Sequence, residues 1–247
     1  MPAGVTASEP VVRALLAAIE SRDVRAIEDA LSPRATWQNV PHPPAVGRDA
    51  VVRLLGDIVA WSDAVRWDVV SASFGPDTAW LERVDRFVIE GVEHAVRCNG
   101  VFTVADGVVA DVRDYVDLGE WRARVGPALT AMADRPAESV VRRHLDGVLA
   151  LDPVRMASDY AHDAVLVRPD GERRGRRAIA DYFDTVSERL GDGELRFGPV
   201  APEGDGVAIV RWTIARASNG PVSGTDTYEI AAGRISRQTV TFDATDF

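Results

Sequence analysis

Apolar residues recur with a helical period at the start of the chain and with a strand period further on. Between Pro10 and Glu20 they return every three or four positions, which predicts an amphipathic helix. Further helices are expected over 24–31, ended by Pro33, and from Asp49, as its cap, to residue 58. Alternation at every second residue predicts strands over 35–40, 65–74, 78–89, 94–105 and 108–116, before a short closing helix over 120–125. Helices followed by a strand meander are typical of an α+β domain, with helices on one face of a curved sheet.

The second half of the chain repeats this order. Short motifs return in sequence: Val11-Val12-Arg13 as Val140-Val141-Arg142, and Gly47-Arg48 as Gly175-Arg176. Helices are expected over 138–149, 153–161 and 177–190, and strands over 164–168, 194–199, 207–217, 222–231 and 234–242. Residues 126–137 have Gly and Pro at their ends and little periodicity. We therefore expect two tandem domains, 1–125 and 138–247, joined by a linker over 126–137.

Composition and charge narrow the classes of function. The 247 residues carry a formal net charge of −10, which repels phosphate backbones, so we expect no nucleic-acid partner. No apolar run approaches the roughly 20 residues of a membrane span, and no secretory signal is visible, so we expect no membrane contact and a cytoplasmic protein. Cys98 is the only cysteine and the four histidines lack metal-ligand spacing, so we expect no metal site.

Three charged residues fall on otherwise apolar strand faces. In the strand over 78–89, Arg83 and Asp85 share a face with apolar residues, and in the last strand of the first half Asp114 does the same. Burial of three charges is costly unless they pair, and an arginine can bind one carboxylate on each edge of its planar fork. The pattern predicts one arginine and two carboxylates in a mostly apolar pocket. A structural ion network on a half-exposed sheet remains the alternative.

The first half also resembles limonene epoxide hydrolases, from about residue 11 to residue 125. The motifs that carry the resemblance are Trp37-Gln38-Asn39, Pro41-His42-Pro43-Pro44-Ala45-Val46-Gly47, Glu82-Arg83-Val84-Asp85, Gly100-Val101-Phe102 and Arg113-Asp114-Tyr115. The resemblance implies the cone-shaped fold of the nuclear transport factor 2-like, or SnoaL-like, superfamily. It also implies that Asp114 is a general base, Asp85 a general acid and Arg83 the bridge between them.

By the same resemblance, Asn39 helps to hold the nucleophilic water, and Trp37 stands where the family has a tyrosine that shares this task. An epoxide-opening water must lose a proton while the epoxide oxygen gains one, which suits one ionised and one protonated carboxyl group and needs neither metal nor organic cofactor. Two departures stand out. Trp37 cannot accept a proton from water, and Val112 replaces a tryptophan, which is expected to widen the pocket.

These departures leave several functions open. The leading hypothesis is an epoxide hydrolase acting on a hydrophobic small molecule, and the resemblance to the superfamily implies one of polyketide type. If water is poorly held, a hydroxyl group of the substrate could attack instead, which would make the protein an epoxide-opening cyclase. A ketosteroid-isomerase-like isomerase or cyclase and a non-catalytic protein that binds a hydrophobic ligand are the further alternatives.

The second half lacks this set of residues. Alignment of the two copies places Trp212, Ile214 and Val240 opposite Arg83, Asp85 and Asp114. Asp170 and Asp226 are interpreted as a loop residue and a sheet-surface residue. The second copy is therefore expected to be a degenerate SnoaL-like domain with a structural or substrate-gripping role. Since members of the family pair through their sheets, the expected state is a monomer with an internal pseudo-dimer, with a homodimer as the alternative.

Overall fold

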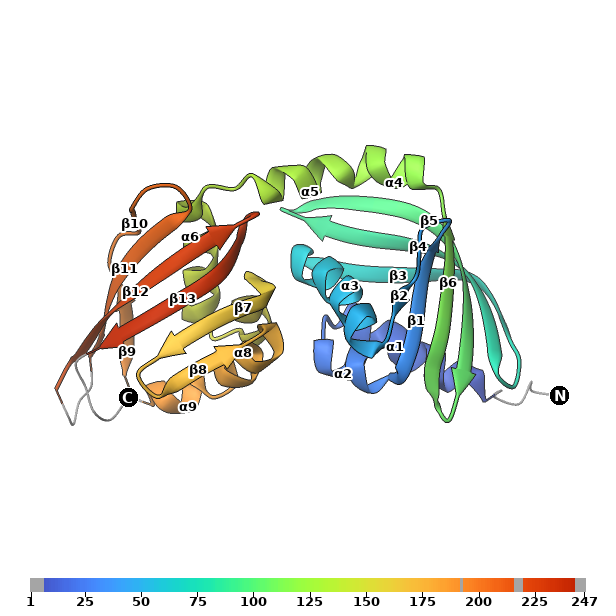
Figure 1. The fold of residues 1–247 in the computed structure, drawn as a ribbon, viewed down its shortest axis with the longest axis horizontal. Helices are drawn as coiled ribbons and strands as arrows, with labels where there is room; N and C mark the ends of the chain where they lie inside the picture. Colours follow the sequence, from blue (N-terminus) through green and yellow to red (C-terminus); the bar gives the residue numbers. More distant parts are fainter. Residues whose placement is uncertain (1–6, 192, 216–219, 243–247) are drawn as a thin grey trace. The chain divides into compact units, whose positions relative to one another are not determined.

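The computed structural model describes residues 7–191, 193–215 and 220–242, which form two compact units. The first domain comprises residues 1–129 and the second domain residues 130–247, so the division falls within 126–137 (Figure 1). Each domain has helices packed on a mixed β-sheet, and the predicted α+β class is confirmed for both. Neither sheet, as far as it is described, closes into a barrel.

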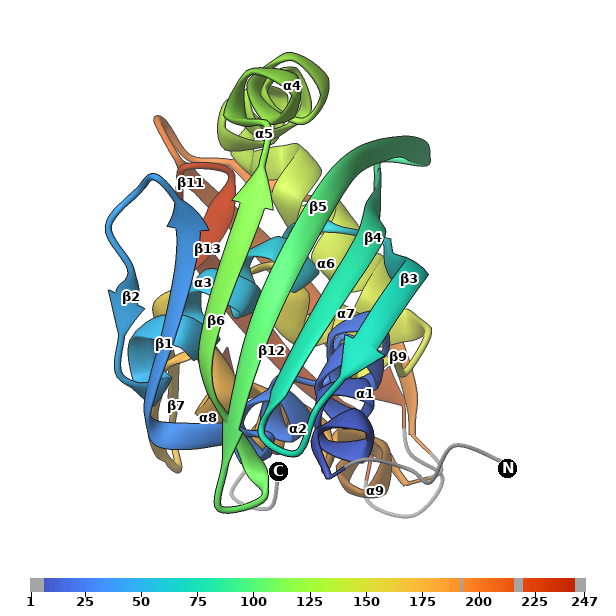
Figure 2. The same cartoon turned by 90° about the vertical axis from the view of Figure 1, so that its right-hand side faces the viewer.

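The first domain contains a six-stranded sheet in the order β2-β1-β6-β5-β4-β3 (Figure 2). All neighbouring strands are antiparallel except β1 and β6, which are parallel. Its helices are α1 (Ser8–Glu20), α2 (Val24–Asp29), α3 (Arg48–Trp61) and α4 (Leu118–Arg124), and α5 (Gly126–Ala133) crosses the division. Its strands are β1 (Leu31–Val40), β2 (Ala45–Val46), β3 (Ala64–Phe74), β4 (Thr78–Ile89), β5 (Val92–Ala105) and β6 (Val108–Val116).

The second domain repeats this topology, with β13 and β7 as the parallel pair. Its sheet has the order β10-β11-β12-β13-β7-β8, and β9 pairs with β11. Its helices are α6 (Ala137–Leu149), α7 (Pro153–Ser158), α8 (Arg176–Phe183) and α9 (Val186–Leu190). Its strands are β7 (Tyr160–Arg168), β8 (Gly171–Arg174), β9 (Glu194–Phe197), β10 (Ala201–Pro202), β11 (Val207–Ala215), β12 (Val222–Ala231) and β13 (Arg234–Phe242).

The core of the first domain lies between the helices and one face of the sheet. Helix α1 buries its apolar stripe, including Val12, Leu15 and Ile19, and it contacts β3, β4, β5 and β6. Strand β4 buries alternate residues from Ala79 to Ile89 on the same side. The face that carries the candidate charged residues is therefore the inner one.

Several element boundaries differ from the sequence prediction. Helix α2 ends at Asp29 and not near Pro33, which lies within β1. The pairing of β1 with β6 is irregular between Leu31 and Thr36, because a proline has no backbone N–H to complete the ladder. Asp49 lies in the first turn of α3, whose N-cap is Gly47.

The expected linker is largely helical. Residues Gly126–Ala133 form α5, although their sequence has little amphipathic pattern. The single helix expected over 177–190 is divided into α8 and α9, and β8 forms in a segment expected to be a loop. The end of the expected strand 207–217 lies outside the described residues.

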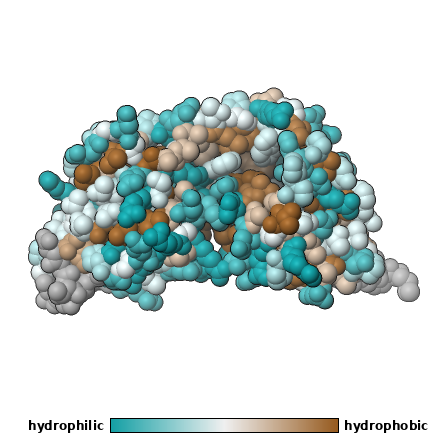
Figure 3. Space-filling view, in the orientation of Figure 1, coloured by the Kyte–Doolittle hydropathy of each residue, from teal (hydrophilic) through white to brown (hydrophobic). Residues whose placement is uncertain are grey.

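Hydrophilic and hydrophobic residues are interspersed on the face of each domain that Figure 3 shows. Among the described helices, none is long and apolar enough to cross a membrane. Over the same residues, no group of three or more His, Cys, Asp or Glu side chains is arranged to hold a metal ion.

Candidate active site

Two strands of the first domain supply the three predicted charged residues, and they are brought together. Arg83 and Asp85 lie on β4, and Asp114 lies on β6, with β5 between the two strands. The side-chain exposures are 0% for Arg83, 11% for Asp85 and 5% for Asp114. The three residues therefore form a buried ionic cluster on the inner face of the sheet.

Arg83 holds one carboxylate on each side of its guanidinium group. Its Nε donates to Asp85 Oδ1 at 2.7 Å and its Nη2 to Asp85 Oδ2 at 3.2 Å. The same Nη2 donates to Asp114 Oδ2 at 2.7 Å. Charge-assisted bonds of this length compensate the loss of hydration that burial imposes on the ions.

Gly100 makes this contact across β5 feasible. It pairs in register with Asp114, and it lies beneath the guanidinium group of Arg83. A Cβ atom at this position would lie 2.2 Å from Arg83 Nη1 and 2.8 Å from Asp114 Oδ1. In the sequence, Gly100 stands out only as part of a motif. Its steric role depends on the register of β4, β5 and β6, which the sequence does not reveal.

Gly100→Ala is therefore expected to displace Arg83 from Asp114. We expect the free energy of unfolding to fall by about 1–3 kcal/mol, the usual cost of overpacking a closely packed site. Urea unfolding measures this effect. Gly126→Ala is the control, since nothing lies within 4 Å of a Cβ atom there. Wild-type stability of Gly100→Ala would contradict the close approach of Arg83 to Gly100.

Burial and pairing set the protonation of the cluster. Burial raises the pKa of Asp85 to about 6, although Arg83 opposes this shift. Burial alone would lower the pKa of Arg83, but the carboxylates of Asp114 and Asp85 raise it above its ordinary value. Burial also raises the pKa of the Cys98 thiol well above its usual value. Near neutral pH the cluster thus holds a permanent cation, a neutral thiol and one carboxyl group that can carry a proton.

Aromatic rings fix the position of Arg83 further. Its guanidinium carbon lies 4.4 Å from the centre of the Trp67 ring and 5.7 Å from that of Phe102. A cation over an aromatic face is stabilised by the ring quadrupole, most strongly where water is excluded. The arginine has little freedom to leave the two carboxylates.

Trp37 makes a contact that the sequence analysis did not foresee. Its Nε1 donates to Asp114 Oδ2 at 3.1 Å, so its N–H is directed at the carboxylate of Asp114. The other oxygen, Asp114 Oδ1, is buried without a hydrogen-bond partner among the described residues. Asn39 pairs in register with Asp114 across β1 and β6, and both line the same cavity. Asp114 thus has one oxygen held by Arg83 and Trp37 and one unengaged.

The cluster faces a cavity of about 410 Å³ with mainly apolar walls. Asp85 and Asp114 line it, together with residues of α3, β3 and β5 and with Trp121 and Leu129 of helices α4 and α5. The volume is within the range typical of small-molecule sites. Val112 is fully buried and is not among the residues that line this cavity.

The second domain has no such cluster at the corresponding positions. Trp212, Ile214 and Val240 line a separate, smaller cavity there. One expectation was wrong: Asp226 is not a sheet-surface residue but is buried with 6% exposure. Its burial could have been foreseen, because Val222, Asp226 and Tyr228 follow the every-second-residue pattern of one strand face.

Comparisons with known proteins identify the family. The profile of the SnoaL-like domain family matches residues 12–112 and 141–238, one copy in each domain and together more than half of the chain.

Single domains of the chain also resemble solved structures. An LEH-like epoxide hydrolase from M. tuberculosis is 23% identical, with a TM-score of 0.43, and the match covers 51% of this chain and 94% of that one. The epoxide hydrolase/cyclase-like enzyme SalBIII of salinomycin biosynthesis is 17% identical, with a TM-score of 0.42 and coverage of 45% and 92%. A protein with a ketosteroid isomerase-like fold from Catenulispora acidiphila, solved with trimethylamine, is 20% identical, with a TM-score of 0.42 and coverage of 48% and 94%. On the strength of the family match, the chain belongs to the SnoaL-like domain family and contains two tandem copies of its domain.

Proposed function

We propose that the first domain catalyses cofactor-free opening of an epoxide ring in a hydrophobic small molecule, with water as the nucleophile. The observation that carries the proposal is the pair of buried carboxylates, Asp85 and Asp114, joined through Arg83 and facing an apolar cavity. Acid–base opening of an epoxide needs one carboxyl group to accept a proton and another to donate one. A pocket with few other polar groups suits an apolar substrate.

In the proposed reaction, Asp114 removes a proton from water, and its unengaged Oδ1 is the oxygen suited to this task. The water oxygen forms a bond to one epoxide carbon as the C–O bond of the ring breaks. The departing oxygen takes the proton of Asp85, whose raised pKa favours the protonated form. The product is a diol, and return of a proton from Asp114 to Asp85 restores the site.

The neighbours of Asp114 support distinct roles. We propose that Asn39, beside Asp114 on β1, positions the water. Trp37 orients the base through its bond to Oδ2 and does not bind the water itself. This assignment suits the chemistry of an indole, which can donate a hydrogen bond but cannot accept one.

An epoxide-opening cyclase is the second candidate. It would use the same three charged residues, with a hydroxyl group of the substrate in place of water. Trp37 bonds to Asp114, whereas the tyrosine that the family has at this position would bond to the water. The water therefore has one protein partner fewer here, which favours the cyclase. An isomerase that removes a proton next to a carbonyl group is disfavoured, since an arginine-paired carboxylate is a weaker base.

The decisive measurement is mass spectrometry of epoxides incubated with the protein in oxygen-18 water. The panel contains cyclohexene oxide, styrene oxide, limonene oxide and hydroxyl-bearing epoxides. We expect the wild type to form diols with one labelled oxygen and Asp114→Asn to lose at least 10²-fold in rate, the usual contribution of a general base. Asp111→Asn is the control, because Asp111 lies on the same strand but is half-buried and bonded to Thr36.

Three outcomes separate the candidates. Labelled diol from the wild type alone supports hydrolysis, with Asp114 as the base. Unlabelled cyclic ether from a hydroxyl-bearing epoxide, again from the wild type alone, supports cyclisation. Undiminished turnover by Asp114→Asn would contradict the assignment of the base.

A further inference from the structure

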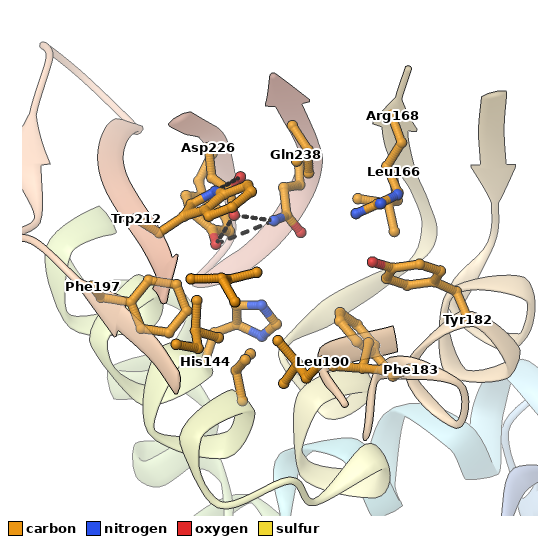
Figure 4. Close-up of a pocket in the computed structure, with 16 residues that line it drawn as sticks. His144, Leu166, Arg168, Tyr182, Phe183, Leu190, Phe197, Trp212, Asp226 and Gln238 are labelled. Carbon is orange, nitrogen blue, oxygen red and sulfur yellow. Dashed lines mark hydrogen bonds between the residues drawn. The ribbon is translucent and has the colours of Figure 1, made fainter. Parts of the chain in front are cut away.

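The second domain contains a cavity of its own, lined by residues of helices α6, α8 and α9 and of strands β7, β9, β11, β12 and β13 (Figure 4). Its volume is about 70 Å³. Most of its wall is apolar, including Leu166, Phe183, Leu190 and Phe197. Four polar or charged side chains also line it and have no counterpart in the ionic cluster of the first domain: His144, Arg168, Asp226 and Gln238.

Asp226 is the fixed polar group of this cavity. Its Oδ1 accepts from Trp212 Nε1 at 2.8 Å. Its Oδ2 accepts from Gln238 Nε2 at 2.8 Å and from Tyr228 OH at 3.0 Å. Gln238 is held in turn by the hydroxyl group of Tyr160. The network fixes the carboxyl group in one orientation at the wall of the cavity.

His144 supplies a polar atom that the protein does not use. The residue is 1% exposed and comes from α6, and its ring points into the middle of the pocket between Phe197 and Leu190 (Figure 4). Its Nδ1 is buried and has no hydrogen-bond partner among the described residues. Burial lowers the pKa of His144 to about 4, although a hydrogen bond to the backbone of Met156 opposes this shift, so the imidazole is neutral at pH 7 and Nδ1 is left as an acceptor. A buried ring nitrogen without a partner costs free energy, and a ligand can recover it.

The charged groups beside the cavity have partners within the protein. Arg168 is 6% exposed, and its Nε donates to Asp170 Oδ1 at 3.2 Å. Arg173 and Arg189 also lie 2.8 and 3.9 Å from Asp170 Oδ2. Burial raises the pKa of Asp226 to about 6, although its hydrogen bonds and the charge of Arg168 oppose this rise. A ligand with a full charge would lose its hydration in this mostly apolar cavity, whereas a neutral dipolar ligand would lose much less.

The size of the cavity limits the ligand further. A cavity of about 150 Å³ accommodates benzene, which has six non-hydrogen atoms, so a cavity of about 70 Å³ suits a molecule of roughly three to four. We propose that this cavity is a second small-molecule site, which binds a small neutral alcohol with a branched apolar body. The hydroxyl group of the ligand donates to Nδ1 of His144, and its apolar body contacts Leu166, Phe183 and Phe197. This site is independent of the reaction proposed for the first domain.

Methyl NMR of the full chain tests the proposal, with 2-propanol as the probe. We expect saturable shifts of the Leu166 and Val240 methyl groups, with a Kd on the order of 1 mM, as the small size of the probe implies. Both residues line the second cavity, so binding in the first domain would leave them unmoved. Two charged molecules of the same size, isopropylammonium and acetate, should bind at least tenfold more weakly.

Two variants separate binding from folding. His144→Phe retains a ring that can pack against Tyr160 and Phe183, and it should weaken 2-propanol binding about fivefold through loss of one hydrogen bond. Leu195→Trp fills the cavity from a half-buried position on β9 and should abolish the shifts, whereas Leu149→Trp, at a position with 55% exposure, should not. Unmoved methyl groups in the folded wild type would overturn the proposal. Shifts that persist in folded Leu195→Trp, or tighter binding of either ion, would also overturn it.

Discussion

Arg83→Met is expected to lower the free energy of unfolding of the first domain by about 3–5 kcal/mol at pH 7 and to abolish the proposed epoxide opening. Arg83 is the partner of two carboxylates, Asp85 and Asp114, each of which is largely buried. Methionine has a similar length but no charge, so it would leave both carboxylates without a cation. An uncompensated buried charge costs more than the original pair contributed.

The loss of unfolding free energy in Arg83→Met should increase with pH. Arg83 opposes the rise in the pKa of Asp85, so its removal moves that pKa further above its ordinary value. A carboxyl group with a raised pKa in the folded state contributes stability at low pH, and this is lost as the pH rises through the folded pKa. The deficit of Arg83→Met should therefore grow from about pH 4 to beyond pH 6 and shrink in acid.

Urea unfolding followed by tryptophan fluorescence measures this effect, because Trp212 is the only one of the six tryptophans in the second domain. Arg86→Met is the matched control. Arg86 lies on the same strand, is 29% exposed and pairs with Asp68 and Glu93 at the surface. Its loss should cost much less, because solvent-exposed ion pairs contribute little to stability. Equal effects of the two substitutions would contradict the assignment of Arg83 as the essential counter-ion.

Much of the first site could be predicted from alternation along two strands. Arg83 and Asp85 are two residues apart on β4, so they must share a face, and the apolar residues around them indicate which face is buried. Asp114 likewise lies among apolar residues on the buried face of β6. That the three residues meet depends on their neighbours in space. The guanidinium group of Arg83 reaches Asp114 across β5 only because Gly100 has no side chain there.

The second domain was harder to interpret from sequence. Alignment with the first domain shows only that the charges of Arg83, Asp85 and Asp114 do not recur at the corresponding strand positions. The polar groups of its cavity come from other positions: His144 from α6, Arg168 from β7 and Asp226 from β12. Sequence periodicity places such residues on faces but does not reveal that faces of a helix and two strands surround one space.

The proposed acid, Asp85, predicts a pH profile and a large loss on substitution. Its pKa is raised to about 6, chiefly by burial, and it must be protonated to deliver a proton to the epoxide oxygen. We expect kcat/KM on an accepted epoxide to fall about tenfold per pH unit above pH 6. At pH 7 about one tenth of the molecules would then carry the reactive proton.

Asp85→Asn removes the titrating group while it retains the size of the side chain. We expect kcat/KM at pH 6 to fall by about 10²–10⁴-fold, the usual contribution of a general acid, and the alkaline limb to disappear from the residual rate. Asp68→Asn, at an exposed carboxylate on β3 that pairs with Arg86, should leave both the rate and the profile unchanged. A wild-type rate that rises through pH 6 would instead mean that ionised Asp85 is the base. The roles of the two carboxylates would then be exchanged, although Arg83 would still join them.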